Sequence, residues 1–188
     1  MFPPSGNCRR AVFFDRDGVI NASVIRNGKP FPPDSIREMQ ILPGVKDALV
    51  SLRNAGYLNI IVTNQPDIRT GKQSIEVLVA MHRYLESNLA IDHIEVCTHV
   101  DADICNCRKP GPGMLLQAAA RFGIEISASY LVGDRWRDIE AGQRAGCKAN
   151  YFIDYQYAER RPVEPFVMVD SALQAAQAIL LADITNTI

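Results

Sequence analysis

A regular alternation of short apolar runs with segments of helical periodicity most constrains the fold of this chain. Apolar runs bounded by polar or turn residues predict buried strands, and apolar positions three or four residues apart predict helices. The predicted strands are 11–14, 57–62, 94–97, 130–132, 151–153 and 166–169. The predicted helices are 45–55, 75–89, 114–122, 139–145 and 172–181. Strands that alternate with helices indicate an α/β chain: a doubly wound, mainly parallel sheet between two helical layers.

The length and composition favour one globular domain over residues 1–188. The chain has 188 residues, 47% of them hydrophobic, and no repeat or linker divides it. Residues 22–43 are rich in proline and aperiodic, so we predict a long loop there. Between residues 56 and 94 we predict only one helix. Neither segment is suited to form a folded lid, so we expect no large cap domain.

Charge and hydropathy exclude several classes of partner. The formal net charge is −1, whereas a dedicated nucleic-acid-binding domain is usually clearly basic. No apolar run approaches the ~20 residues of a membrane-spanning helix, and residues 1–8 do not resemble a signal peptide. We therefore expect a cytoplasmic protein with no nucleic-acid or membrane partner, in which clustered cysteines favour metal over disulfides. The sequence does not fix the oligomeric state, and we favour a monomer.

Polar residues follow four of the apolar runs, at the strand ends where doubly wound sheets bind ligands. Asp15 and Asp17 come directly after the first run, and a period of two puts their side chains together and Arg16 opposite. Paired carboxylates suit a nucleophile with an acid/base, or the ligation of a divalent cation. Asp134 follows another run, and as a third carboxylate it favours Mg²⁺. Taken alone, the first pair could equally form a turn.

Two further residues are candidates for binding a phosphoryl group. Thr63 directly follows the second predicted strand, at a strand end where its hydroxyl could contact a phosphoryl oxygen. Lys109 supplies a point charge and Arg108 a bidentate fork, in a rigid turn before a helix. Each has a structural alternative: Thr63 as a strand residue or helix cap, and the two basic residues as a solvated pair.

Together, these segments resemble the haloacid dehalogenase superfamily of phosphatases. The matching motifs are Phe13-Phe14-Asp15-Arg16-Asp17-Gly18-Val19-Ile20-Asn21, Val62-Thr63-Asn64-Gln65, Arg108-Lys109-Pro110 and Gly133-Asp134-Arg135-Trp136-Arg137-Asp138. Their order and spacing are most similar to the small, cap-less branch that contains heptose bisphosphate phosphatases and histidinol-phosphate phosphatases.

The resemblance implies a role for each residue in these motifs. Asp15 would be the nucleophile that forms an aspartyl-phosphate, and Asp17 would act first as general acid and then as base. Mg²⁺ would be held by Asp15, the backbone carbonyl of Asp17, and Asp134. Thr63 and Lys109 would neutralise phosphoryl oxygens.

Asp138, in the last motif, has two alternative roles. It would orient the metal waters or the lysine, or it is simply an acid favoured at a helix start.

A second metal site is predicted in the loop at about 97–107. Cys97, His99, Cys105 and Cys107 form two close pairs, which suit a closed tetrahedral zinc site. The resemblance supports this prediction, because heptose bisphosphate phosphatases carry such a structural zinc loop just before the Arg-Lys-Pro motif. The zinc would fix Arg108 and the following lysine toward the active site. Alternatively, these cysteines are small buried hydrophobes, or two of them form a redox pair.

The expected substrate is a small phosphorylated metabolite. Basic residues occur throughout the predicted pocket loops: Arg26, Lys29, Arg69, Lys72, Arg108, Lys109, Arg135 and Arg137. We predict that Ser23, Arg26, Asn64 and Arg108 bind substrate. The resemblance favours a sugar bisphosphate, D-glycero-D-manno-heptose 1,7-bisphosphate cleaved at the 7-phosphate. Alternatives are histidinol phosphate or another sugar phosphate, a nucleic-acid 3′-phosphatase module, and an inactive zinc-binding interaction domain.

Overall fold

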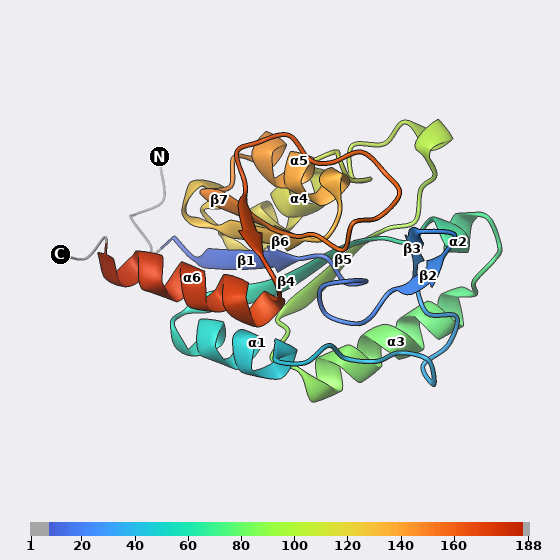
Figure 1. The fold of residues 1–188 in the computed structure, drawn as a ribbon, viewed down its shortest axis with the longest axis horizontal. Helices are drawn as coiled ribbons and strands as arrows, with labels where there is room; N and C mark the ends of the chain where they lie inside the picture. The colour runs from blue at the N-terminus through green and yellow to red at the C-terminus, as the bar shows by residue number, and fades with distance from the viewer. Residues whose placement is uncertain (1–7, 186–188) are drawn as a thin grey trace.

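A six-stranded sheet forms the centre of the computed structural model, which describes residues 8–185 (Figure 1). Its strands are β1 (Arg10–Phe14), β4 (Tyr57–Asn64), β5 (His93–Cys97), β6 (Tyr130–Gly133), β7 (Ala149–Ile153) and β8 (Val167–Val169). They lie in the order β5-β4-β1-β6-β7-β8, and every neighbouring pair is parallel. The predicted doubly wound α/β fold is confirmed.

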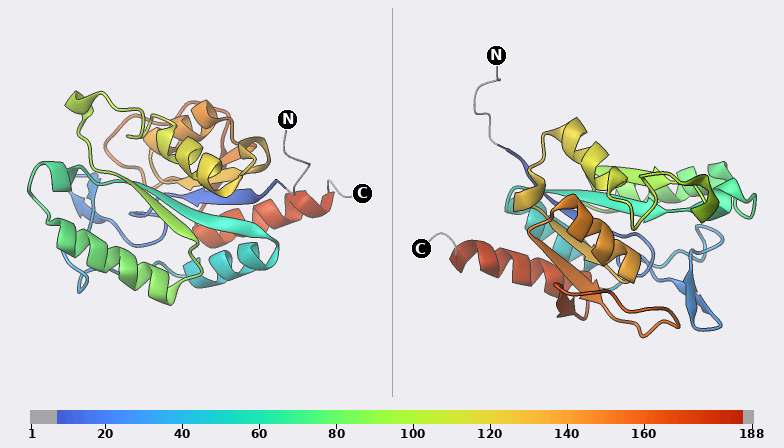
Figure 2. Two further views of the ribbon diagram at one scale, coloured as in Figure 1. Left: turned by 180° about the vertical axis from the view of Figure 1, so that it is seen from behind. Right: turned by 90° about the horizontal axis from the view of Figure 1, so that it is seen from above.

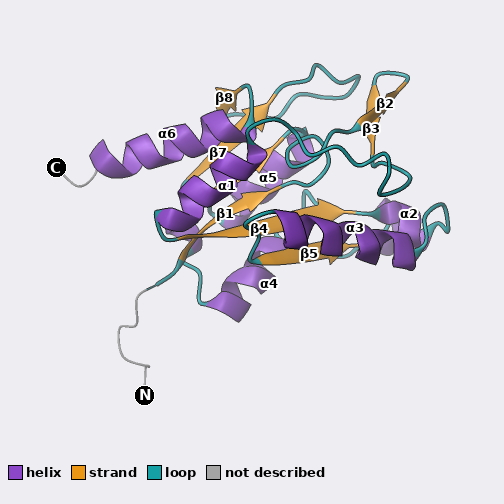
Figure 3. Cartoon of the chain, turned by 90° about the horizontal axis from the view of Figure 1, so that it is seen from below, coloured by secondary structure: helices purple, strands orange, loops and turns teal. Residues whose placement is uncertain are grey.

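Helices cover both faces of this sheet (Figure 1 and Figure 3). One face packs against α1 (Val45–Asn54), α3 (Ile75–Asn88) and α6 (Ala172–Thr185), and the other against α4 (Gly113–Phe122) and α5 (Trp136–Ala145). Phe13 and Phe14 belong to opposite cores because side chains alternate along a strand. Burial on both faces explains why the strands read as continuous apolar runs. No helix within residues 8–185 is both long and apolar enough to span a membrane.

The proline-rich segment predicted as a loop contains a β-hairpin. Its strands, β2 (Val24–Arg26) and β3 (Lys29–Phe31), pair antiparallel around Asn27 and Gly28, whose φ angles are 52° and 72°. An Asn-Gly pair with positive φ is the preferred two-residue hairpin turn, and this signal was available in the sequence. The prediction of a long loop over 22–43 was therefore wrong for residues 24–31. The hairpin lies at the opposite end of the molecule from the start of β1 (Figure 2).

The segment between β4 and β5 holds two helices rather than the one predicted. The additional helix is α2 (Pro66–Arg69), with a proline in its first turn. A four-residue helix is too short to produce a helical apolar period, which explains the error. The longer α3 begins where the hydroxyl of Ser74 accepts a hydrogen bond from the backbone N–H of Val77, at 3.3 Å.

The order of the strands creates a topological switch point at β1. The chain passes from β1 through β4 to β5 on one side, and it later returns through β6, β7 and β8 on the other. A crevice therefore opens at the carboxyl end of β1, between β4 and β6. In open α/β sheets this is the place where ligands bind.

Candidate active site

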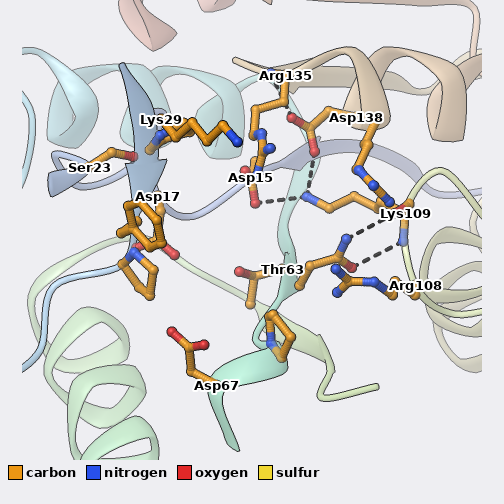
Figure 4. Close-up of a pocket in the computed structure, with 16 residues that line it drawn as sticks. Asp15, Asp17, Ser23, Lys29, Thr63, Asp67, Arg108, Lys109, Arg135 and Asp138 are labelled. Atoms are coloured by element: carbon orange, nitrogen blue, oxygen red, sulfur yellow. Dashed lines mark hydrogen bonds and ion pairs between the residues drawn. The ribbon is translucent and has the colours of Figure 1, made fainter. Parts of the chain in front are cut away.

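The predicted catalytic residues meet at this switch point (Figure 4). A cavity of about 280 Å³ opens there, and the walls include the following predicted residues: Asp15, Asp17, Ser23, Thr63, Asn64, Arg108 and Lys109. Asp15 directly follows β1, and Thr63 is the second-to-last residue of β4. Lys29, Pro30 and Phe31 of the hairpin form another part of the wall.

Lys109 is the buried cation at the centre of the site, and Figure 4 shows it pointing between two carboxylates. Its Nζ donates to Asp15 Oδ1 at 2.8 Å and to the carbonyl of Val62 at 2.7 Å, and it pairs with Asp138 Oδ1 at 2.6 Å. Burial lowers the pKa of Lys109, but the two carboxylates outweigh burial and raise it above its ordinary value. The ammonium therefore stays charged.

Three buried carboxylates lie beside this lysine. The cluster contains one carboxylate oxygen from each of Asp15, Asp134 and Asp138, and these three atoms lie within 4.8 Å of one another. Burial raises the pKa of Asp15 to about 6, and burial together with the charge of Asp15 raises the pKa of Asp134 well above its ordinary value. Oδ1 of Asp134 is buried and has no hydrogen-bond partner among the described residues. The single positive charge of Lys109 does not balance the negative charges of three carboxylates. A cluster of carboxylate oxygens, one of them without a hydrogen-bond partner, fits Mg²⁺, which prefers oxygen ligands.

Asp138 contributes to this cluster more directly than the sequence indicated. Its carboxylate pairs with Lys109 and also accepts a hydrogen bond from the backbone N–H of Arg135 at 2.9 Å. Contacts for both roles left open for Asp138 are thus present, since it caps the start of α5 and pairs with Lys109. The carboxylate of Asp17 does not belong to the group of three. A metal contact through its backbone carbonyl stays a prediction.

Asp17 is held as a carboxylate by its neighbours. Arg16 donates to both of its oxygens, at 3.1 and 2.8 Å, and Asn21 and Gln65 donate at 2.9 and 2.8 Å. Burial raises the pKa of Asp17, but Arg16 and these hydrogen bonds outweigh burial and lower it below its ordinary value. The prediction that Arg16 lies opposite Asp17 was wrong. β1 ends at Phe14, so the alternation of a strand does not continue through this turn.

Three of the predicted substrate-binding residues differ in their surroundings. Asn64 uses both ends of its amide on the backbone of Lys109, donating to the carbonyl and accepting from the N–H, each at 3.0 Å. It therefore positions the lysine. Ser23 lines the cavity, whereas Arg26 is not among the lining residues and pairs with Asp34 at 2.7 Å. The structure thus does not bring Arg26 to this pocket.

A basic rim forms around the cavity from only some of the predicted residues. Those that line it are Lys29, Arg108, Lys109, Arg135 and Arg137, while Arg26, Arg69 and Lys72 do not. Arg108 and Arg137 share one partner, Asp101, at 2.7 and 3.2 Å. Asp101 lies in the predicted zinc loop, and no pattern in the sequence indicated this contact. The side chain of Arg108 also donates to the carbonyl of His99 at 3.0 Å.

The four predicted zinc ligands come together as one cluster. The contacts that join Cys97, His99, Cys105 and Cys107 measure from 3.1 to 3.7 Å between sulfur or Nδ1 atoms. Zn–S bonds of about 2.3 Å separate the donors of a tetrahedral site by roughly 3.8 Å, whereas a disulfide needs about 2.05 Å. The cysteines are free thiols and the four donors fit a closed zinc site.

Comparison with known proteins gives the same assignment. The HAD-hydrolase-like family model matches residues 106–151. A D-glycero-beta-D-manno-heptose-1,7-bisphosphate 7-phosphatase of Vibrio cholerae is 36% identical in an alignment of 148 positions that covers 72% of this chain and 76% of the relative. A D-glycero-alpha-D-manno-heptose-1,7-bisphosphate 7-phosphatase of Photorhabdus laumondii is 30% identical in an alignment of 182 positions that covers 90% of this chain and 96% of the relative.

Solved structures extend the similarity over nearly the whole chain. The D,D-heptose 1,7-bisphosphate phosphatase of B. bronchiseptica, complexed with magnesium and phosphate, has a TM-score of 0.78 and 29% identity. The match covers 92% of this chain and 99% of that one. The chain is thus a phosphoric monoester hydrolase that belongs to the haloacid dehalogenase superfamily of phosphatases, in the branch of the heptose bisphosphate phosphatases.

Proposed function

We propose that this chain hydrolyses the 7-phosphate of D-glycero-D-manno-heptose 1,7-bisphosphate. The observation that carries the proposal is the cavity lined by Asp15, Asp17, Thr63 and Lys109, in which Asp15 forms a carboxylate cluster with Asp134 and Asp138. Relatives that span about three quarters of this chain bear the name of this activity. The basic rim around the cavity supports a substrate with more than one anionic group.

Mg²⁺ is the cation that the carboxylate cluster fits. Asp15, Asp134 and the backbone carbonyl of Asp17 would hold it, with Asp138 oriented toward Lys109 and the metal waters. When bound, the cation supplies positive charge to the phosphoryl oxygens. It also offsets the repulsion among buried carboxylates, which one lysine leaves uncompensated.

In the first step, the carboxylate of Asp15 attacks phosphorus and the bond from phosphorus to the sugar oxygen breaks. Lys109 and the hydroxyl of Thr63 stabilise the phosphoryl oxygens, where phosphoryl transfer needs stabilisation most. Asp17 gives its proton to the departing sugar oxygen. Asp17 binds this proton once the dianionic phosphoryl group is near, because a neighbouring negative charge raises the pKa of a carboxyl group.

In the second step, Asp17 returns as a base. It takes a proton from a water molecule, whose oxygen attacks the phosphorus of the aspartyl-phosphate. The bond from phosphorus to Asp15 breaks, and inorganic phosphate leaves with the free carboxylate restored. Gln65 donates to Asp17 at 2.8 Å and to Thr63 at 2.9 Å, which keeps the acid/base and the phosphate-binding hydroxyl together.

The zinc cluster would organise the wall that recognises the rest of the substrate. Cys105 Sγ accepts a hydrogen bond from the backbone N–H of Arg108 at 3.4 Å, and Asp101 of the same loop pairs with the Arg108 side chain. The guanidinium is thereby held at the cavity wall, where it would bind an anionic or hydroxyl group of the sugar. Ser23 would contribute a hydroxyl from the hairpin side.

We also propose that the chain acts as a single-domain, cytoplasmic monomer without a nucleic-acid or membrane partner. Free cysteines arranged around a metal site suit a reducing compartment. The near-neutral charge offers no attraction for polyanions. The molar mass measured by light scattering after size-exclusion chromatography tests the monomeric state. The mass of a dimer would contradict it.

The function is tested by phosphate release from both anomers of the heptose bisphosphate. Histidinol phosphate and fructose 1,6-bisphosphate serve as comparison substrates. We expect a higher kcat/KM for a heptose anomer than for either comparison, and a loss of at least about 10³-fold in Asp15→Asn. Asp47→Asn is the matched control, because Asp47 is an exposed residue of α1. Wild-type rates in Asp15→Asn would refute the mechanism, and a preference for histidinol phosphate would refute the substrate.

A further inference from the structure

Residues 155–160, here called the strap, follow β7 and contact three parts of the active site. The hydroxyl of Tyr157 donates to Asp134 Oδ2 at 2.8 Å. The next residue, Ala158, donates its backbone N–H to the carbonyl of Gly28 at 2.8 Å, and Glu159 pairs with Arg135. The strap thus joins the carboxylate cluster to the turn of the β2–β3 hairpin, which forms part of the wall of the catalytic cavity.

The contact with Tyr157 reaches the most buried carboxylate of the cluster. Asp134 is 1% exposed, and it lines a second cavity of about 300 Å³ whose wall includes Tyr157 and Glu159. This cavity is separate from the catalytic pocket and opens beside the strap. The tyrosine and the carboxylate expected to bind the cation therefore lie side by side in the wall of this second cavity.

The two oxygens of Asp134 have different surroundings. Oδ2 accepts from Tyr157 and packs so closely on Gly18 that a Cβ there would lie 1.8 Å away. Oδ1 is buried and has no hydrogen-bond partner within residues 8–185. One oxygen is thus fixed from two sides, and the other is left for a ligand. A rotation that turns the carboxylate out of its present plane would break the hydrogen bond to Tyr157.

We propose that Tyr157 is a positioning residue that fixes Asp134 for cation binding. Groups that hydrogen-bond metal-ligating carboxylates set their orientation, and their loss typically weakens metal affinity about 10- to 100-fold. The ring of Tyr157 is itself held, because Ala158 is tied to the hairpin and Tyr155 stacks on it at 5.6 Å between ring centroids. This role rests on the proposed Mg²⁺ site and does not depend on the identity of the sugar.

The test compares two tyrosine-to-phenylalanine variants of the full chain. Tyr157→Phe removes the hydroxyl that contacts Asp134 and keeps the ring. Tyr155→Phe is the matched control, since Tyr155 is 44% exposed and stacks on the same ring. Mg²⁺ is titrated by calorimetry, and the fluorescence of Trp136, the single tryptophan, gives a second readout two residues from Asp134.

We expect the Kd for Mg²⁺ to rise about tenfold in Tyr157→Phe and to stay within twofold of wild type in Tyr155→Phe. The Mg²⁺ concentration for half-maximal activity should rise by the same factor, while kcat at saturating Mg²⁺ stays within about twofold. An unchanged Kd in Tyr157→Phe, or equal weakening in both variants, overturns the proposal.

Failure of the proposed function gives a different result. A wild-type chain that binds Mg²⁺ but does not cleave the heptose bisphosphate refutes the substrate and leaves the calorimetric comparison valid. A wild-type chain that does not bind Mg²⁺ refutes the cation site and the role of Tyr157 together. A fall in kcat with an unchanged Kd in Tyr157→Phe also overturns the role, since Tyr157 would then act on another group.

Discussion

Replacing Gly18 by alanine should displace the Asp134 carboxylate without altering any charged residue. Gly18 has a φ of 94°, and a Cβ built on it would lie 1.8 Å from Asp134 Oδ2. Contacts under 3.0 Å are essentially never seen for Cβ atoms, so the carboxylate or the loop has to move. A displacement of about 1 Å in a catalytic site costs on the order of 10²-fold in rate. We expect kcat/KM to fall by about that factor in Gly18→Ala.

Gly56→Ala separates this displacement from simple backbone strain. Gly56 has a φ of 85°, but no atom lies within 4 Å of the position that its Cβ would occupy. The left-handed conformation costs an L-residue about 1–2 kcal/mol, and this cost applies to both variants. For a chain of this length it lowers Tm by about 2–8 °C. The additional 10²-fold loss of activity, equivalent to about 2.7 kcal/mol, should appear in Gly18→Ala alone.

The assay combines thermal unfolding with phosphate release at saturating Mg²⁺. Both variants should show a similar fall in Tm, and Gly56→Ala should keep the wild-type kcat/KM. Activity in Gly18→Ala within threefold of Gly56→Ala would refute the reasoning. It would mean that the contact between Gly18 and Asp134 does not determine the geometry of the site.

Three further perturbations address other parts of the molecule. Metal analysis should find one zinc per chain, and Cys107→Ser should remove it and lower Tm by at least about 5 °C; zinc-free wild-type protein would contradict this. Arg108→Gln should raise KM for the bisphosphate about tenfold, as expected for one charge-assisted hydrogen bond, and change KM for p-nitrophenyl phosphate less than threefold. Burial and the charge of Arg16 lower the pKa of His82 from 6.5 to about 4, so the unfolded chain binds a proton that the folded chain excludes. Stability should therefore fall as the pH drops from about 6.5 to 4, by up to about 3 kcal/mol from this residue, and urea unfolding of His82→Gln should show a shallower decline.

The sheet was predictable because its strands are buried on both faces. A central parallel strand such as β1 is apolar at consecutive positions, and this pattern is visible in a single sequence. The β2–β3 hairpin lacks that signal, since its residues are half-buried or exposed and it contains Pro30. α2 is also short. Elements that bury little apolar surface leave little periodicity in the sequence, and these are the elements that were missed.

The candidate site was predictable where its residues follow strand ends. Asp15, Thr63 and Asp134 are brought together by the topology alone, because the carboxyl ends of β1, β4 and β6 are neighbours. Tyr157 lies in an irregular segment and Asp101 in a single 3₁₀ turn (Asp101–Asp103), and their partners come from other parts of the chain. No local pattern determines where such a side chain points. Their contacts follow from the path of the loops, which depends on the packing of the whole domain.

The cluster of thiols also explains how an irregular segment places a buried lysine. Lys109 has to satisfy Asp15, Asp138 and a carbonyl at once, so its backbone must be fixed closely. The segment around it has no ladder of backbone hydrogen bonds, since it lies between β5 and α4.

Two sets of contacts replace that ladder. On one side, Cys105 Sγ accepts a hydrogen bond from the backbone N–H of Arg108, which directly follows Cys107, a second thiol of the cluster. On the other, the amide of Asn64 binds both backbone groups of Lys109 and connects them to β4. A zinc ion that holds the thiols would therefore fix one end of a short span, and the sheet fixes the other. Loss of zinc should then reduce activity through Lys109, although none of the thiols of the cluster lines the catalytic cavity.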